Sequence, residues 1–242
     1  MDTIRIQAGQ CRIIAHRGLS GLEKENTNLA FVAAANRSYY GIETDIHRTA
    51  DGKFIVIHDD KTDRVSGMHC KVEETDLAIL RRITLTDTDG STGRVDLHLP
   101  TFEEYVSVCK KYEKVSVLEL KGALSAEDAE AIIATLRNAG QLEQTVFISF
   151  GLQNLIHVRE RSPEQPIQYL FSEWKPEILG ILRQYRFDAD AYFGALTEEL
   201  VAELHRNGIA VNCWTVNRPE DAERLVGWGV DFITSNILEA AR

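Results

Sequence analysis

The sequence has few cysteines and no pattern that would pair them. No C-x-x-C pair occurs, and the four cysteines are Cys11, Cys70, Cys109 and Cys213. This spacing argues against a disulfide framework and a zinc site, and it is typical of free thiols in a reducing compartment. The first ten residues lack the apolar segment of a signal peptide, and no apolar run approaches membrane-spanning length. We therefore expect a cytoplasmic protein without stable membrane insertion.

Positive charge is also scarce. The chain has 27 Lys and Arg residues against 37 Asp and Glu residues, which gives a net charge of -10 at pH 7. Nucleic acids and anionic membranes are bound mainly by clustered Lys and Arg, so this balance argues against both partners. A small anionic substrate stays compatible, because a bound metal and one or two cations can make the field locally positive.

The chain alternates between apolar, β-branched runs and segments with helical periodicity. Eight such runs and at least seven helical segments in 242 residues predict an α/β fold, a (β/α)8 TIM barrel, as a single domain over residues 1–242. No G-x-G-x-x-G follows the first strand, which weakens the dinucleotide-binding alternative. The predicted strands cover 12–15, 41–47, 115–120, 145–149, 166–170, 188–193, 209–215 and 230–234, and the predicted helices cover 27–38, 101–112, 125–139, 151–161, 174–185, 197–207 and 219–228.

Several helix boundaries carry their own markers. Acids follow Thr101, Ser125 and Thr197 within a few positions, as expected where helices start. Gly140 and Gly208 follow helical segments, where a left-handed C-cap favours glycine.

Two regions interrupt the alternation. An Asp-Gly turn at 51–52 separates two strand-like runs, which predicts a hairpin of 42–48 with 53–58. Residues 59–99 then form a long excursion rich in Asp, Thr and Gly, with a short helix predicted near 76–82. An excursion of this length after the second strand is typical of an insertion or a functional loop, and we expect it over the barrel mouth.

Ionisable residues fall where the predicted strands end. His16 and His58 each close a short apolar run, and Glu43 and Asp45 lie two apart, so that both point to one face of their strand. Glu119 ends a further strand, and catalytic groups in a barrel come from these C-terminal ends. Carboxylates beside two histidines predict a metal site for Mg²⁺ or Ca²⁺, held by the three acids, with the histidines as general acid and base.

Four further residues have two readings each, and a fifth is set aside. Arg17 and Lys121 serve as phosphate clamps or neutralise the acids. Trp214 lines the substrate pocket or fills the core. Asn26 hydrogen-bonds near the site or caps the helix that starts near Thr27, and we favour the cap. His47 shares a strand face with the acids, but an imidazole nitrogen suits Ca²⁺ and Mg²⁺ poorly, so we do not count it as a ligand.

Ten short segments, in order along nearly the whole chain, form a larger pattern. They are AHRG at 15–18, ENT with Ala30-Phe31 at 25–31, GIETD at 41–45, TADG at 49–52, VIHD at 56–59, DRVSG at 63–67, LPTFEE at 99–104, LELK at 118–121, WTVN at 214–217 and GVDFIT at 229–234. Together they resemble the glycerophosphodiester phosphodiesterase family. The resemblance implies a TIM barrel, a divalent metal, and hydrolysis of glycerophosphodiesters to glycerol 3-phosphate and an alcohol, with His16 and His58 as the catalytic pair.

One position departs from the family pattern, and several questions stay open. The family usually has proline before the Glu-Asn-Thr triplet, where this chain has Lys24, and the change puts substrate choice in doubt more than activity. A lysophospholipase D-like activity and a non-catalytic barrel that binds phosphate esters are the alternatives. The sequence does not decide which histidine is the base, whether water or a neighbouring hydroxyl attacks, which metal is bound, which alcohol is released, or the oligomeric state.

Overall fold

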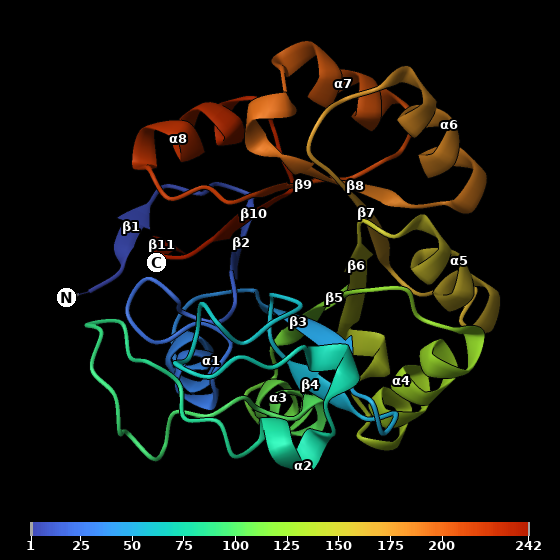
Figure 1. Cartoon of the computed structure of the whole chain (residues 1–242). Coiled ribbons are helices and arrows are strands. Elements are labelled where there is room, and N and C mark those ends of the chain that lie inside the picture. The colour runs from blue at the N-terminus through green and yellow to red at the C-terminus, as the bar shows by residue number, and fades with distance from the viewer. Residues whose placement is uncertain (1, 242) are drawn as a thin grey trace.

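Eight parallel strands close into a ring in the computed structural model, which describes residues 2–241 (Figure 1). Neighbouring strands pair in register around the ring, and β2 pairs with both β10 and β3, which closes it. The fold is therefore the predicted TIM barrel. Its strands are β2 (Arg12–Ala15), β3 (Gly41–Arg48), β5 (Val115–Leu120), β6 (Thr145–Ser149), β7 (Ile167–Phe171), β8 (Asp188–Tyr192), β9 (Val211–Trp214) and β10 (Phe232–Ser235).

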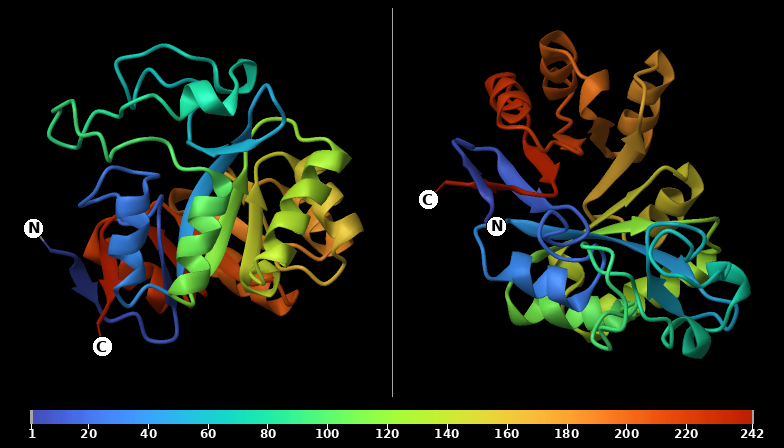
Figure 2. Two further views of the ribbon diagram at one scale, coloured as in Figure 1. Left: turned by 90° about the horizontal axis from the view of Figure 1, so that it is seen from below. Right: turned by 60° about the vertical axis from the view of Figure 1, so that its left-hand side comes forward.

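A helix follows each barrel strand or hairpin except the last strand, β10, and lies outside the ring (Figures 1 and 2). Each predicted helical segment contains one helix. Thr101, Ser125 and Thr197 are N-caps whose side chains accept backbone hydrogen bonds, as their sequence context predicted. The helices are α1 (Asn28–Ala35), α3 (Phe102–Lys111), α4 (Ala126–Asn138), α5 (Leu152–Arg161), α6 (Pro176–Tyr185), α7 (Glu198–Arg206) and α8 (Pro219–Gly227).

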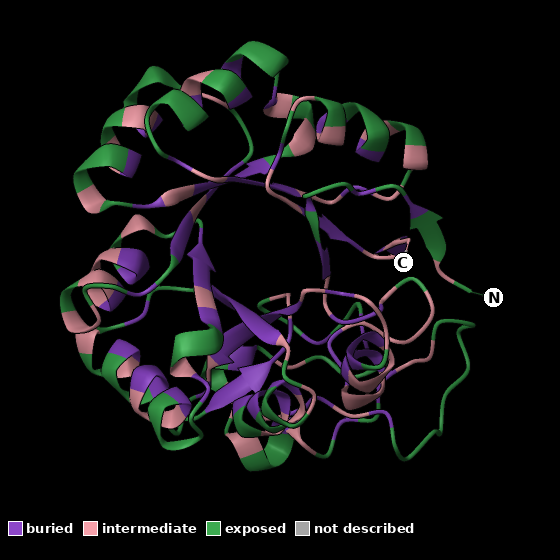
Figure 3. Cartoon of the chain, turned by 180° about the vertical axis from the view of Figure 1, so that it is seen from behind, coloured by how far each residue is buried: buried purple, intermediate pink, exposed green. Residues whose placement is uncertain are grey.

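The core lies between the ring and its helices. All six residues of β5 are buried, as are the first seven of β3, because strands of a parallel barrel are covered on both faces. Figure 3 shows the buried residues along the strands and on the inner helix faces, with exposed residues on the outer faces. A buried polar side chain in this ring therefore points either into the barrel interior or into the helical layer.

The predicted hairpin is present, since β4 (Phe54–Val56) pairs antiparallel with β3. The excursion that follows contains η1 (Val72–Glu74) and α2 (Leu77–Leu80), and it lies at the end of the barrel toward which the strands point (Figure 2). Val65, Leu85 and Leu97 of the excursion belong to a separate apolar cluster that also includes Ile55 and Ile57. The excursion is thus a packed unit beside the mouth, on the side of β3 and α3.

The sequence analysis missed one pair of strands. β1 (Ile4–Ile6) pairs in parallel with β11 (Leu238–Ala240), and this pairing ties the two ends of the chain together. Three-residue strands show no measurable periodicity, so the pattern analysis had nothing to detect. Two short 3-10 turns complete the elements, η2 (Leu142–Gln144) and η3 (Phe193–Ala195). Within residues 2–241 no helix is both long and apolar enough to cross a membrane, and all four cysteines are free thiols.

Candidate active site

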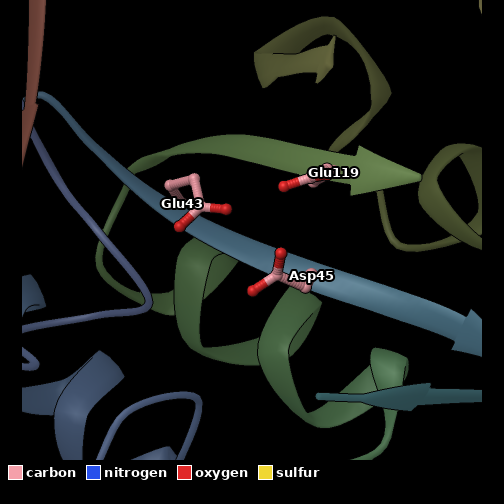
Figure 4. Close-up of side chains that lie close together, drawn as sticks. All are labelled: Glu43, Asp45 and Glu119. Carbon is pink, nitrogen blue, oxygen red and sulfur yellow. The ribbon is translucent and has the colours of Figure 1, made fainter. Parts of the chain in front are cut away.

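Three acidic side chains converge inside the C-terminal end of the barrel (Figure 4). Glu43 and Asp45 come from β3, and Glu119 comes from the neighbouring strand β5, where it pairs in register with Asp45. One carboxylate oxygen from each lies within 4.8 Å of the others, and all three residues are buried. Three carboxylates at this spacing repel one another in a medium of low dielectric, so the arrangement requires compensating positive charge.

The protonation equilibria of these acids reflect that cost. Burial, reinforced by the nearby Asp45, raises the pKa of Glu119 to about 8 and raises the pKa of Glu43 well above its ordinary value. Burial also acts to raise the pKa of Asp45, but the Arg17 and Lys121 cations overcome it and hold that pKa below the ordinary range. Such a set of acids is only partly neutralised by protein cations.

The cluster fits a hard divalent cation. Its donors are all carboxylate oxygens, which are the ligands that Mg²⁺ and Ca²⁺ prefer. Oδ1 of Asp45 is buried and has no hydrogen-bond partner among the described residues. A buried oxygen without a partner is unusual in a folded protein, and a coordinated metal ion would supply the missing interaction. Glu43, Asp45 and Glu119 are the residues that would hold it.

Arg17 and Lys121, the two cationic side chains singled out from sequence, both contact the acids. Lys121 Nζ is 2.8 Å from Glu119 Oε1 and 3.7 Å from Asp45 Oδ1, and Arg17 Nε is 3.6 Å from Asp45 Oδ2. The backbone N–H of Arg17 also donates to Glu43 Oε2 at 2.8 Å. Charge neutralisation, one of the two readings from sequence, is therefore visible in these contacts. The phosphate-clamp reading of Arg17 and Lys121 stays a prediction.

Local backbone geometry places Arg17 against the acids. Arg17 has φ +54 and Gly18 has φ +74, both in the left-handed region. A Cβ on Gly18 would lie 2.6 Å from the backbone of Ala30 in α1, so only glycine fits there. This tight turn directly after β2 lets the loop double back so that the N–H of Arg17 faces β3.

Asn26 belongs to the site rather than to the helix end. Its Nδ2 donates to Asp45 Oδ2 at 2.8 Å, and its Oδ1 accepts from the Thr44 hydroxyl at 2.7 Å. The side chain of Thr27 caps α1 by accepting from the N–H of Ala30. The prediction that Asn26 caps this helix was wrong, because a side chain that orients a buried carboxylate is not available to the helix terminus.

The two predicted catalytic histidines line one cavity but have different partners. Nδ1 of His16 is 2.6 Å from the amide oxygen Oδ1 of Asn236, whereas Nδ1 of His58 is 2.6 Å from the carboxylate oxygen Oδ1 of Asp59. No hydrogen bond among the described residues uses Nε2 of either ring. Burial and the adjacent Arg17 lower the pKa of His16 to about 4, and burial also lowers the pKa of His58.

A charge network behind the site was not assigned from sequence. Arg64, from the excursion, makes hydrogen bonds to both oxygens of Asp59, at 2.6 and 3.2 Å, and to both oxygens of Glu25, at 2.7 and 2.8 Å. Glu25 in turn accepts from Arg17 Nη1 at 2.9 Å, and Asp59 bonds His58. All three residues lie in the segments that carry the family resemblance, which was the only sequence feature that marked them.

The cavity that these residues open into has a second, largely apolar wall. Its volume, measured as the space open to the centres of water molecules, is about 100 Å³. Phe150 and Trp214 lie at 5.6 Å between ring centroids on this wall, and Tyr192 packs on Trp214 at 5.8 Å. Trp214 therefore lines this cavity, which agrees with the first of the two readings of this residue from sequence. The cavity is lined by His16, Arg17, Glu43, His58, Glu119, Ile148, Phe150, Leu170, Asp190, Trp214, Thr215 and Thr234.

His47 lies apart from the acid cluster. Its Nδ1 is 3.3 Å from Glu73 Oε1 and its Nε2 is 3.2 Å from the carbonyl oxygen of His58. It thus links the excursion to the backbone of His58. It is not one of the three converging acids, and it was not counted as a metal ligand from sequence.

Comparison with known proteins relates this geometry to one family. Residues 16–239 match the model of the Glycerophosphoryl diester phosphodiesterase family. The sequence is 27% identical to a glycerophosphodiester phosphodiesterase of Bacillus subtilis, over 92% of this chain and 82% of that protein. It is 28% identical to one of Caldanaerobacter subterraneus subsp. tengcongensis, over 93% of both chains.

Solved structures show the same barrel. A phosphodiesterase of Oleispira antarctica, in complex with the product sn-glycerol-3-phosphate, superposes with a TM-score of 0.86 at 24% identity and covers 93% of both chains. A putative glycerophosphoryl diester phosphodiesterase of Silicibacter pomeroyi has a TM-score of 0.84 at 27% identity and covers 96% of this chain and 92% of its own. The fold of this chain is thus shared with solved phosphodiesterase structures.

Proposed function

Because the chain belongs to the glycerophosphoryl diester phosphodiesterase family, we propose that it hydrolyses glycerophosphodiesters to sn-glycerol 3-phosphate and an alcohol in a metal-dependent reaction. The observation that carries the proposal is a cluster of three buried carboxylates beside a single cavity, which Glu43 and Glu119 of the cluster line together with both histidines. A barrel that only binds phosphate esters needs the charge but has no use for two imidazoles with free Nε2 atoms.

Glu43, Asp45 and Glu119 hold the metal in this proposal. When bound, Mg²⁺ or Ca²⁺ stabilises the negative charge that develops on the phosphate oxygens. Arg17 and Lys121 add positive charge beside the same oxygens, while Asn26 fixes the orientation of Asp45. Arg17 offers a planar fork for two oxygens and Lys121 a compact charge for a third.

The partners of the two histidines support one assignment of their roles. The amide oxygen of Asn236 accepts a hydrogen bond from Nδ1–H of His16 but carries no charge, so it stabilises an imidazolium less than a carboxylate does, and His16 is neutral with a free lone pair on Nε2. Asp59, on Nδ1 of His58, stabilises the imidazolium form. His16 therefore takes the proton from the attacking hydroxyl, and His58 gives a proton from Nε2 to the departing alkoxide.

Two attacking groups are compatible with this arrangement. Water attacks phosphorus directly, or the neighbouring hydroxyl of the glycerol half attacks and forms a cyclic phosphate that water then opens. Detection of cyclic glycerol phosphate in a quenched reaction supports the second route. Incorporation of oxygen-18 from water without that species supports the first.

A direct assay tests the activity. We expect purified protein to release sn-glycerol 3-phosphate from glycerophosphocholine with Mg²⁺ or Ca²⁺, and a chelator to abolish release until metal is restored. Absence of turnover across a panel of glycerophosphodiesters and divalent metals would contradict the proposal. Binding of the diesters without turnover would support the non-catalytic alternative.

Leaving-group chemistry tests the two histidine roles. His58→Gln should lower turnover of glycerophosphocholine by about 10²- to 10⁴-fold, the range of a lost general acid or base. A 4-nitrophenyl ester of glycerol phosphate needs no protonation of its leaving group, so His58→Gln should lose much less activity on it. His16→Gln should lose activity equally on both esters. The reverse pattern would exchange the roles of the two rings.

A second candidate activity is supported by a groove beside the cavity. The groove shares Phe150 and Leu170 with the cavity and continues over Phe171, Ile178 and Ile181. An acyl chain needs an apolar path of this kind, which supports a lysophospholipase D-like activity on lysophosphatidylcholine. A higher kcat/KM for lysophosphatidylcholine than for glycerophosphocholine would establish this activity as the main one.

A further inference from the structure

One acid in the cavity has no role in the mechanism described above. Asp190 points into the barrel interior from β8, lines the cavity, and is 1% exposed. Its Oδ1 has no hydrogen-bond partner among the described residues, and no ion pair within them involves its carboxyl group. Asp45 and Glu119, by contrast, contact Arg17 or Lys121.

The polar residues on the neighbouring strands are already engaged with one another. β8 pairs with β7 on one side and β9 on the other. Nδ2 of Asn212, on β9, donates to Gln168 Oε1, on β7, at 3.0 Å, and Asn212 Oδ1 accepts from the Thr234 hydroxyl at 3.2 Å. These residues therefore leave the carboxyl group of Asp190 without a partner for its Oδ1, and a buried polar group without a partner calls for one from a ligand.

The rest of the wall is apolar. Ile148, Leu170 and the aromatic pair of Phe150 and Trp214 line the same cavity as Asp190. Carbon-bound hydrogens on a short chain suit such a wall, and a hydroxyl group suits a carboxyl group embedded in it. This combination matches a small polyol attached to the phosphate.

We propose that Asp190 binds the hydroxyl groups of the glycerol half of the substrate and so selects glycerol-containing phosphates. The proposal rests on the proposed function, in which the phosphate lies at the acid cluster. Burial, with the charge of Glu119, raises the pKa of Asp190 well above its ordinary value and favours the neutral acid. A neutral carboxyl group both donates and accepts hydrogen bonds, as a hydroxyl group does, and it lacks the negative charge that would attract the quaternary ammonium of phosphocholine.

Calorimetric binding with Mg²⁺ present tests this role. The probes are sn-glycerol 3-phosphate, inorganic phosphate and phosphocholine, each titrated into the full-length protein. Asp190→Ala should weaken binding of sn-glycerol 3-phosphate about tenfold relative to inorganic phosphate, the equivalent of one lost hydrogen bond to a buried partner. Asp190→Asn keeps a donor and an acceptor in the same volume, so it should retain part of the preference.

A matched control lies two residues away on the same strand. Asp188 accepts a hydrogen bond from the N–H of Ala210 and does not line this cavity. Asp188→Asn makes the same acid-to-amide change and should leave the ratio of the two affinities as in the wild type. Circular dichroism and Tm of each variant separate a lost contact from a lost fold, because a purely structural role would move Tm without moving the ratio.

The outcomes separate this inference from the proposed function. A wild-type protein that binds sn-glycerol 3-phosphate no tighter than inorganic phosphate would overturn the inference, as would an unchanged preference in Asp190→Ala. A selective loss of phosphocholine binding in Asp190→Ala would also overturn it and assign an ammonium ligand instead. If the preference for glycerol phosphate holds but glycerophosphocholine is not hydrolysed, the proposed function fails and the role of Asp190 survives.

Discussion

The two halves of the barrel mouth are built from different chemistry. The half formed by β2, β3, β5 and the excursion holds the three clustered acids, both cations and both histidines, and all of them except His16, whose ring bonds Asn236, belong to one connected set of hydrogen bonds and ion pairs. The half formed by β6 to β9 offers Ile148, Leu170, Phe150 and Trp214, with Asp190 as a buried acid whose Oδ1 has no hydrogen-bond partner among the described residues. In the proposed function, the first half contains the groups that act on the phosphoester bond. The second half contacts the parts of the substrate that are attached to the phosphate. Rate and selectivity should therefore respond to mutations in different halves.

The largest effect is expected in the charged half. Asp45→Asn removes a charge from the metal site and should lower metal-dependent turnover by roughly 10³-fold, equivalent to several kcal/mol of electrostatic stabilisation. Because the variant also removes a buried charge, the fold should persist, as measured by circular dichroism. Glu43→Gln should behave in the same way. Full activity in both variants would remove these acids from the metal site.

A change of partner on His16 should shift the pH profile. His16 works as a base only when neutral, so kcat/KM should fall as the pH drops through its pKa of about 4. Asn236→Asp replaces the amide oxygen on Nδ1 with a carboxylate, which stabilises the imidazolium and raises that pKa. The acidic limb of the profile should therefore move to higher pH. A limb that stays in place would show that another group controls it.

Disruption of the Arg64 network behind the charged half should have a smaller effect on kcat/KM. Arg64→Ala frees both Asp59 and Glu25, and loss of such a supporting contact should lower kcat/KM roughly tenfold. Arg94 offers a matched control, because it also pairs with two acids of the excursion, Asp87 and Asp96, and does not line the cavity. Equal losses in Arg64→Ala and Arg94→Ala would indicate a general effect on the excursion rather than positioning of His58 and Arg17.

The smallest effect is expected on the apolar wall. Phe150→Ala removes one ring from the pair with Trp214 and should raise KM for glycerophosphocholine about threefold, within the range of a single aromatic contact. Binding of inorganic phosphate provides the internal reference and should weaken less. A loss of kcat as large as that of Asp45→Asn would erase the distinction between the two halves.

Much of the fold and of the charged half could be predicted from sequence. Strand and helix periodicities are local properties, and all eight barrel strands and all seven predicted helices appear within a few residues of their expected positions. The converging acids were also predictable, because alternation in a strand places Glu43 and Asp45 on one face. Asn26 was misassigned because its partner, Asp45, is separated from it by 19 residues and only folding brings them together.

The acids of β8 show why the other half was harder to predict. Asp188 and Asp190 stand in the same alternating context, Asp-Ala-Asp-Ala, and nothing in that context distinguishes them. Only the position of each acid along the closed barrel places Asp190 in the cavity and Asp188 away from it. Arg64 is a similar case, since it looks like any charged residue in a polar loop until the excursion folds back to Glu25.

The sequence by itself determined the alternation of strands and helices, the presence of oxygen ligands and imidazoles at strand ends, and the family to which their order belongs. These features follow from local periodicity and from the identity of side chains. Tertiary structure alone decided which partner each histidine received, which acid was left without one, and how the excursion reaches behind the site. Those contacts join residues far apart in the chain, and their geometry exists only once the barrel closes.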